Sequence, residues 1–202
     1  MNHPVYLVDD DEAVRAALAL LLETVGINVR TFEGPNVFLE CLDTLPQGCL
    51  ILDIRMPMMT GLKLQEKLLS ASVSWPTIII SGHGDIDACR RAFRNGAIDF
   101  LSKPIDEQDL IDAIQRGLSV VEERVRQEAE ASETLALFSQ LSKREKEVLE
   151  MVAKGITSQQ IADALSVSPR TVESHRASLG KKLGTTSTAE QATLWQEALN
   201  FP

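Results

Sequence analysis

Apolar residues in the first 121 positions follow two alternating patterns. Short continuous apolar runs are typical of strands that are buried on both faces of a sheet. Between these runs, apolar residues return every three or four positions, which is typical of amphipathic helices. The sequence therefore predicts five strands that alternate with five helices, the strands lying near 5–8, 28–32, 49–52, 76–81 and 98–101.

Such alternation predicts an α/β fold, with a parallel five-stranded sheet, right-handed crossovers and helices on both faces. In open parallel sheets, ligands bind beyond the carboxyl ends of the strands. Five polar residues follow these strand ends and are expected to converge on one edge of the sheet: Asp9, Asp10, Asp53, Ser81 and Lys103.

The chemistry of these side chains favours phosphoryl transfer. Grouped carboxylates repel one another and require a cation, and a hard ion such as Mg²⁺ (or Mn²⁺) suits oxygen ligands. Asp53 stands alone at its strand end and is the expected nucleophile for an aspartyl-phosphate, whereas the Asp9/Asp10 pair better suits the metal. Lys103 would supply a cation for the phosphate and Ser81 a hydroxyl donor. Any one of these residues could instead be a turn former or a helix cap, but the whole set favours a site.

The charge of the chain is unevenly distributed. Its 202 residues include 29 acidic and 20 basic side chains, a net charge of −9. Residues 1–121 carry −7 and residues 122–140 carry −3, whereas residues 141–184 carry +3. This asymmetry predicts two domains with different partners, at 1–121 and 141–202, joined by a linker at 122–140. The acidic total therefore does not exclude binding to nucleic acid.

The linker allows two interpretations. Apolar positions continue at intervals of three and four from Leu110 to Ala129, and no Gly or Pro interrupts 118–141. This spacing predicts a helix that continues from the first domain. A frayed, solvated segment rich in Glu and Arg fits the composition equally well.

Composition indicates an ordinary globular protein of the cytoplasm. Hydrophobic residues make up 44% and charged residues 24% of the chain, which is enough to fill real cores. No apolar run approaches the ~18 residues of a membrane span, and no basic segment precedes an apolar stretch at the N-terminus. The three cysteines are therefore interpreted as small apolar residues in a reducing compartment.

The basic part of the chain predicts a small all-α domain. Ser142 and Glu145 have the spacing of a capping box at the start of one helix. A later turn ends at Ser168, which is expected to cap a further helix with Pro169 in its first position. Two short helices joined by a tight turn, the second one basic, predict a helix-turn-helix that enters the DNA major groove. The residues expected on its DNA-facing side are Arg170, Thr171, Ser174, His175, Arg176 and Lys182.

Four motifs in the first domain resemble those of response-regulator receiver domains. They are Val8-Asp9-Asp10-Asp11, Leu52-Asp53-Ile54-Arg55-Met56-Pro57, Ile80-Ser81-Gly82-His83-Gly84 and Lys103-Pro104, within a resemblance that covers 4–121. The resemblance implies a flavodoxin-like (βα)5 fold and a chain that is not an enzyme, apart from slow self-dephosphorylation. It implies that a sensor histidine kinase phosphorylates Asp53.

The same resemblance assigns further roles to residues around Asp53. Mg²⁺ would be held by Asp10, Asp53 and the backbone carbonyl of Arg55, with Asp9 in support. Ser81 and Phe100 occupy the family's switch positions, and Lys103-Pro104 its usual cis peptide. Asp11 is an additional acid, and we expect it to cap the first helix.

The second domain resembles the LuxR-type helix-turn-helix of the FixJ/NarL regulators over 138–200. The residues that carry the resemblance are Leu141-Ser142, Arg144-Glu145, Glu147-Val148-Leu149, Gly155, Ile161-Ala162, Ser168-Pro169-Arg170-Thr171-Val172 and His175. The resemblance implies a homodimer that forms on phosphorylation through the fourth helix and fifth strand. It implies promoter DNA and RNA polymerase as partners, with transcription activation as the outcome.

Two alternatives belong to other functional classes. Asp-x-Asp after a strand also opens phosphatases of the haloacid-dehalogenase type, where Asp9 would be the nucleophile. Position 13, where that family has Thr or Val, is Ala13, and this alternative leaves Asp53 without a role. An adaptor whose helical domain binds protein is the other alternative, and the +3 charge of 141–184 favours DNA instead.

Overall fold

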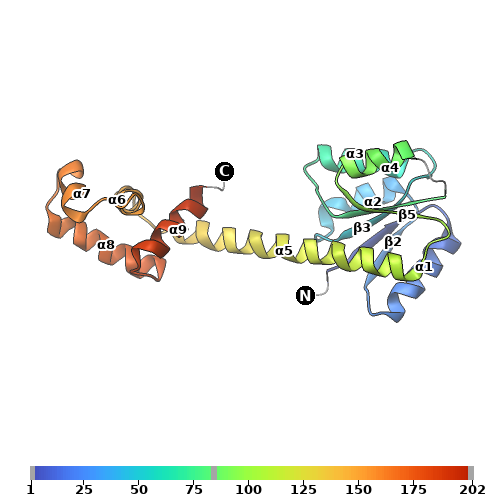
Figure 1. The fold of residues 1–202 in the computed structure, drawn as a ribbon, viewed down its shortest axis with the longest axis horizontal. Helices are drawn as coiled ribbons and strands as arrows, with labels where there is room; N and C mark the ends of the chain where they lie inside the picture. The colour runs from blue at the N-terminus through green and yellow to red at the C-terminus, as the bar shows by residue number, and fades with distance from the viewer. Residues whose placement is uncertain (1–2, 83–85, 200–202) are drawn as a thin grey trace. The chain divides into compact units, whose positions relative to one another are not determined.

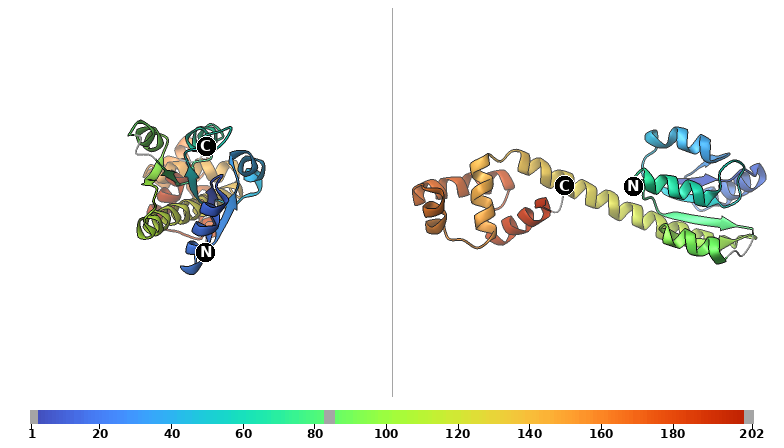
Figure 2. Two further views of the ribbon diagram at one scale, coloured as in Figure 1. Left: turned by 90° about the vertical axis from the view of Figure 1, so that its right-hand side faces the viewer. Right: turned by 90° about the horizontal axis from the view of Figure 1, so that it is seen from above.

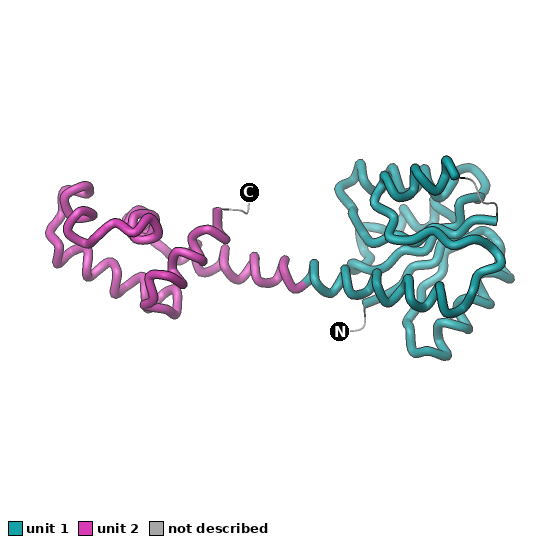
Figure 3. The backbone as a smooth tube through the Cα atoms, in the orientation of Figure 1, with its two compact units in different colours: residues 1–125 teal, residues 126–202 magenta. Residues whose placement is uncertain are grey.

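The chain forms two compact units, residues 1–125 and residues 126–202 (Figure 3). The computed structural model describes residues 3–82 and 86–199. His83 and Gly84, which belong to the glycine-rich motif after the fourth strand, lie outside the described residues. The boundary between the units falls inside the segment 122–140 that the sequence assigns to a linker.

The first unit is built on a parallel sheet with strand order β2-β1-β3-β4-β5 (Figure 1). This order and the alternation of strands with helices confirm the predicted α/β fold. The strands are β1 (Val5–Val8), β2 (Val29–Phe32), β3 (Cys49–Asp53), β4 (Thr77–Ser81) and β5 (Ala97–Ser102). The helices between them are α1 (Glu12–Thr24), α2 (Pro35–Cys41), α3 (Gly61–Ser70) and α4 (Ile86–Arg94), and α5 (Glu107–Ser139) follows the last strand.

Each face of the sheet has its own apolar core. On one face, Leu7 and Ile80 pack with Leu22 of α1 and Ile114 of α5. On the other face, the core includes residues of α2, α3 and α4, such as Phe38, Leu64 and Ala92. Residues of β1, β3 and β4 are almost completely buried because helices cover both faces, which explains the continuous apolar runs in the sequence.

The second helix departs from its predicted bounds. The sequence predicts a helix over 37–45, whereas α2 spans Pro35–Cys41 and a 3₁₀ turn, η1 (Leu42–Thr44), follows it. Pro35 can begin the helix because the first helical position needs no backbone N–H donor. The change of helix type after Cys41 has no signal in the apolar spacing.

The second unit is entirely helical in its described part. It contains the C-terminal portion of α5 together with α6 (Lys143–Ala153), α7 (Ser158–Leu165), α8 (Pro169–Leu183) and α9 (Thr188–Leu199). Of the two linker alternatives, the structure has the continuous helix, since α5 is unbroken over 33 residues. The end of α5 joins the core of this unit, where the rings of Phe138 and Trp195 lie 5.9 Å apart. None of the described helices is both long enough and apolar enough to span a bilayer.

Candidate functional site

The parallel sheet, shown from further directions in Figure 2, brings the predicted polar residues to its carboxyl edge because they follow the ends of its strands. Asp53 is the last residue of β3, where it pairs with Ile80 of β4. Ser81 is the last residue of β4, and its carbonyl accepts a hydrogen bond from the Lys103 backbone N–H at 2.7 Å. The peptide bond between Lys103 and Pro104 is cis. The structure therefore has the cis bond that the resemblance implies.

Lys103 connects two buried carboxylates from different strands. Its Nζ lies 3.0 Å from Asp9 Oδ2 and 2.7 Å from Asp53 Oδ1. Asp9 is 1% exposed and Asp53 4% exposed, so both carboxylates depend on this ammonium group for charge compensation. Asp10, in contrast, is exposed at the rim.

Burial and ion pairing act in opposite directions on these groups. Burial raises the pKa of Asp53, although hydrogen bonding and attraction by Lys103 partly offset that effect. Burial alone would lower the pKa of Lys103, but its hydrogen bonds and attraction to Asp53 and Asp9 outweigh burial and raise it. Lys103 therefore remains a cation at neutral pH, placed where an incoming phosphoryl group would need one.

The donor set fits a divalent cation. Asp9, Asp10 and Asp53 carry three negative charges against the one positive charge of Lys103, which leaves an excess that a divalent ion would neutralise. Within the described residues, no group of three or more His, Cys, Asp or Glu side chains is arranged to hold a metal by itself. A backbone carbonyl and water would have to complete the coordination, and Mg²⁺ usually retains several waters in this way.

The loop after β3 holds Asp53 in position. The backbone N–H of Arg55 donates to Asp53 Oδ2 at 2.6 Å, and the N–H of Gly61 donates to the Ile54 carbonyl at 3.0 Å. A Cβ atom at Gly61 would lie 2.2 Å from the Asp53 carbonyl oxygen. Only glycine therefore lets the start of α3 approach this strand end so closely.

We expect Gly61→Ala to destabilise the first unit by about 1–3 kcal/mol, because the loop and strand must separate to admit the methyl group. Urea unfolding followed by far-UV circular dichroism measures this effect. Gly34→Ala is a matched control at the start of α2, since a Cβ there would meet no atom within 4 Å. Equal losses in the two variants would show that the close contact at Gly61 has no special cost.

Asp11 has the structural role predicted for it. Its side chain accepts hydrogen bonds from the backbone N–H groups of Ala13 and Val14, which makes it the N-cap of α1. Its own N–H donates to Asp9 Oδ1 at 2.8 Å. Arg15, which sequence reasoning missed, donates to the Asp9 carbonyl at 2.7 Å. The first turn of α1 thereby orients Asp9, and no sequence motif indicated this contribution.

The two predicted switch residues differ in their surroundings. Ser81 is 3% exposed at the strand end. Phe100, on β5, is only partly buried and packs against the core that lies on the α2–α3–α4 face of the sheet. The inward rotation of Phe100 implied by the family resemblance stays a prediction.

Helix α8 is positioned by a strong N-terminal cap. Ser168 accepts from the Thr171 backbone N–H, and Pro169 occupies the first helical position, as the sequence predicts. Val172 is buried in the core of the second unit, whereas Arg170 and Ser174 are exposed. His175, like Thr171, is half-buried. The residues nearest the start of α8 therefore offer the most accessible polar groups.

Two of the predicted DNA-facing residues are also engaged within the domain. Arg176 donates to Ser158 Oγ at 3.0 Å and to Thr188 Oγ1 at 3.3 Å, which connects α8 to the starts of α7 and α9. Lys182 Nζ lies 2.7 Å from Glu145 Oε2 and donates to the Gln140 carbonyl at 3.1 Å. Their roles therefore include holding the helices together.

Glu145 lies at the centre of a polar network that sequence reasoning recognised only in part. The capping box with Ser142 is present, but Glu145 is also 4% exposed and accepts from Ser178 Oγ at 2.6 Å. Burial alone would raise its pKa, but the hydrogen bonds from Lys182, Ser178 and Ser142 lower the pKa to about 2. The network joins the start of α6 to α8, the second helix of the predicted helix-turn-helix.

Both parts of the chain match known protein families. The response regulator receiver domain matches residues 5–115, and the family of bacterial regulatory proteins called the luxR family matches residues 139–195. Together these matches cover most of the chain, one in each compact unit.

Similar proteins include full-length regulators. The response regulator protein TmoT of Ectopseudomonas mendocina is 42% identical over 91% of this chain and 83% of its own length. The transcriptional regulatory protein FixJ of Azorhizobium caulinodans is 39% identical over 93% of this chain and 89% of its own. The solved structure of the response regulator StyR has a TM-score of 0.89 at 40% identity and covers 98% of this chain and 100% of that one.

Proposed function

Since the chain belongs to the two-domain response regulators, with a receiver domain and a LuxR-type DNA-binding domain of the FixJ kind, we propose that phosphorylation of Asp53 controls its binding to promoter DNA. Family membership makes it a transcriptional regulator, of a family that is generally non-enzymatic. The phosphoryl donor proposed is the phosphohistidine of a sensor kinase, and the outcome proposed is transcription activation through RNA polymerase.

The chemistry proposed at Asp53 is in-line displacement. A carboxylate oxygen of Asp53 attacks phosphorus, the phosphorus–nitrogen bond of the donor breaks, and its electron pair returns to the imidazole. Bound Mg²⁺ would supply charge neutralisation for the phosphoryl oxygens, with Asp10, Asp53 and the Arg55 carbonyl as the proposed ligands and Asp9 in support. Lys103 can pair with a phosphoryl oxygen once Asp53 is phosphorylated, because formation of the acyl phosphate removes the negative charge of that carboxylate.

Ser81 is the proposed donor to the new phosphoryl group. Its place at the end of β4, beside the Lys103 backbone, sets its hydroxyl at the same edge as Asp53. Movement of Ser81, followed by rotation of Phe100, would change the surface formed by α4 and β5. We propose that two receivers pair through this surface, which brings two copies of α8 to a two-fold DNA site.

One observation carries the assignment of the phosphorylated residue. Asp53 is the buried carboxylate at the end of β3, the central strand of the sheet, and it shares Lys103 with Asp9. Both carboxylates accept on both oxygens, Asp9 from Asp11 and Lys103 and Asp53 from Arg55 and Lys103. Asp9 is less suited to act as a nucleophile because its side chain is only 1% exposed, against 6% for Asp53. This arrangement favours Asp53 over the phosphatase alternative, in which Asp9 attacks.

Intact mass after incubation with acetyl phosphate and Mg²⁺ tests the proposal. We expect the wild-type chain to gain the mass of one phosphoryl group and Asp53→Asn to gain none. Asp43→Asn is the control, because Asp43 is exposed in the 3₁₀ turn. A phosphorylated Asp53→Asn variant would refute the assignment, and turnover of a simple phosphoester would revive the phosphatase alternative.

The DNA contacts proposed from the sequence are Arg170, Thr171, Ser174, His175, Arg176 and Lys182. The exposed Arg170 at the start of α8 is the least constrained of the basic residues among them. The side chain of Lys182 is 35% exposed and forms an ion pair with Glu145. It can therefore approach a DNA phosphate only while it also keeps this ion pair. We therefore propose that Arg170 mainly contacts DNA and that Lys182 mainly stabilises the domain.

Arg170→Ala and Lys182→Met should separate these two roles. We expect Arg170→Ala to make the negative slope of log affinity against log salt less steep by about one. The stability of the domain should not change. Lys182→Met, in contrast, should lower the thermal stability of the second unit. Fluorescence anisotropy with promoter fragments, at several salt concentrations, provides the slope. An unchanged slope in Arg170→Ala would place the DNA-binding face elsewhere.

A further inference from the structure

The exposed side of α8 includes an acid that the sequence-based set of DNA contacts leaves out. At 3.6 residues per turn, the exposed residues that follow Pro169 fall within one arc of about 100°. They are Arg170, Glu173, Ser174, Ala177 and Lys181. The buried residues Val172, Leu179 and Leu183 lie on the other side of the helix and join the core of the second unit. Packing of α8 on this core therefore turns the arc that contains Glu173 outward.

Glu173 lies between the two basic residues of this arc. At a rise of 1.5 Å per residue, Arg170 and Lys181 are ~16 Å apart along α8, which exceeds the ~12 Å width of the major groove. Cations at these positions can therefore reach phosphates at the edges of the groove, while the residues between them face the base edges. Ala177, one turn beyond Glu173, is small enough to let the helix approach the bases closely.

A carboxylate is a costly side chain on a surface that meets DNA. The Glu173 carboxylate has no ion-pair or hydrogen-bond partner among the residues that the structure describes. In the unbound protein this exposed group is hydrated, but in a groove bordered by phosphates it is repelled and loses water. Only a hydrogen-bond donor on the DNA can offset that cost. Glu173 must therefore either accept from a base or weaken binding.

The donor pattern of the major groove selects one base for this contact. The base-edge donors there are the N4 amino group of cytosine and the N6 amino group of adenine. Adenine also presents its N7 acceptor beside N6, and this acceptor repels a carboxylate, whereas cytosine itself presents only the donor. A carboxylate on the groove-facing arc of α8 is therefore best matched to cytosine.

We propose that Glu173 reads a cytosine in each half of the DNA site by accepting a hydrogen bond from its N4 amino group. This inference rests on the proposed function, because it requires α8 to lie in the major groove. The same carboxylate acts against other sequences, since it stays repelled and unpaired wherever no cytosine faces it. Glu173 thus determines which sequence is bound, whereas Arg170 and Lys181 supply affinity for any DNA.

Selection of sites from a random duplex library tests this inference, with the full-length chain phosphorylated by acetyl phosphate in the presence of Mg²⁺. We expect the wild-type sites to share a cytosine in each half, and its replacement by thymine to weaken binding about tenfold. Glu173→Ala should lose this discrimination and bind unrelated DNA more tightly, because a repelled charge is removed. Glu173→Gln should select adenine at the same position, since an amide pairs with adenine N6 and N7.

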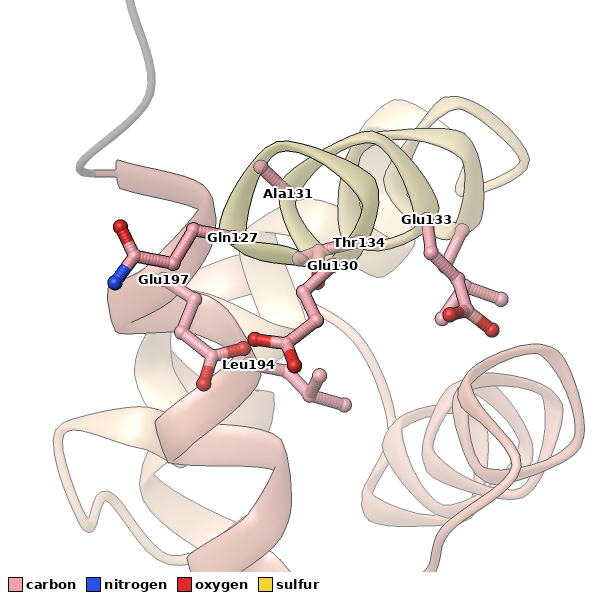
Figure 4. Close-up of a pocket in the computed structure, with 8 residues that line it drawn as sticks. Gln127, Glu130, Ala131, Glu133, Thr134, Leu194 and Glu197 are labelled. Carbon is pink, nitrogen blue, oxygen red and sulfur yellow. The ribbon is translucent and has the colours of Figure 1, made fainter. Parts of the chain in front are cut away.

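A second exposed acid of the same unit provides the matched control. Glu197 of α9 lines a groove together with residues of α5, and Figure 4 shows its carboxylate turned toward Glu130. Glu197→Gln removes the same charge without altering the exposed arc of α8, so it should leave every base preference unchanged. Both Glu173 variants should melt at the wild-type temperature, because the side chain that they replace is exposed.

Three outcomes would overturn the inference. If Glu173→Ala and Glu173→Gln select the same sites as the wild type, Glu173 is only a hydrated surface acid, and the proposed function stands. If the wild type binds duplex DNA but selects no sequence, α8 contacts phosphates alone. If the wild type binds no DNA at all, the proposed function itself fails, and the inference fails with it.

Discussion

Lys103→Met is expected to lower the free energy of unfolding of the receiver by about 3 kcal/mol at neutral pH and to abolish phosphorylation-driven DNA binding. The side chain of Lys103 is 28% exposed, but its partners Asp9 and Asp53 are nearly inaccessible to water. Removing the ammonium group would leave two buried carboxylates facing each other without their cation. The phosphoryl group on Asp53 would lose the same cation, so the switch would fail even where phosphorylation still occurs.

The pH dependence follows from the direction of the two pKa shifts. The folded pKa of Lys103 is raised above its ordinary value of 10.5, so its contribution is complete below that value and is lost as the pH rises through the folded pKa. In Lys103→Met, the pKa of Asp53 should rise further, since the attraction that offsets burial is gone. The variant should therefore recover stability as the pH falls and Asp53 takes up a proton.

A double-mutant cycle separates the ion pair from other effects of the substitution. In an Asp53→Asn background, one of the two buried charges is absent, and Lys103→Met should cost about 1 kcal/mol or less. The sequence has two tryptophans, Trp75 and Trp195, and the ring of Trp75 stacks on Tyr6 in the receiver core at 5.2 Å. In a Trp195→Phe background, tryptophan fluorescence therefore reports on the receiver alone. An unchanged cost in the Asp53→Asn background would show that Lys103 acts independently of this carboxylate.

Sequence reasoning was most successful where one physical pattern repeats. The apolar runs predicted each strand of the sheet to within one or two residues, because strands buried on both faces allow few polar substitutions. Since parallel strands share one carboxyl edge, their end residues Asp53 and Ser81 were also predicted to lie together. Lys103, just past the fifth strand, was expected at this edge for the same reason, but its ion pairs with Asp9 and Asp53 were not predicted.

Individual tertiary contacts, whether near or far in sequence, could not be predicted. Nothing in local spacing indicates that Arg15 reaches back to the Asp9 carbonyl, or that Gly61 must be glycine because Asp53 lies against it. The capping-box pattern located Glu145 but not its partners Ser178 and Lys182, which lie 33 and 37 positions away. For the same reason Lys182, predicted from its exposed helical position as a DNA contact, has a second role that only the packing of α6 on α8 reveals.

The strongest effect in the second unit is expected at Glu145. Glu145→Gln would keep the size of the side chain but remove the charge that pairs with Lys182, leaving that ammonium group half-buried. We expect a loss of about 2–3 kcal/mol in the free energy of unfolding of this unit, because the hydrogen bonds that would weaken are made to a charged and buried acceptor, the Glu145 carboxylate. Glu147→Gln is the matched control, since Glu147 is a more exposed acid on the same helix.

The pH profile of the wild-type unit distinguishes this network from simple packing. The folded pKa of Glu145 is lowered from 4.5 to about 2, so its stabilisation is complete above the unfolded value and is lost as the pH falls through this interval. In a Trp75→Phe background, Trp195 reports on this unit alone, and its urea midpoint should fall between pH 5 and pH 2. Glu145→Gln should reduce this fall, whereas Glu147→Gln should retain it. If Glu145→Gln and the wild type lose stability in parallel over that interval, the charge of Glu145 is not what joins α6 to α8.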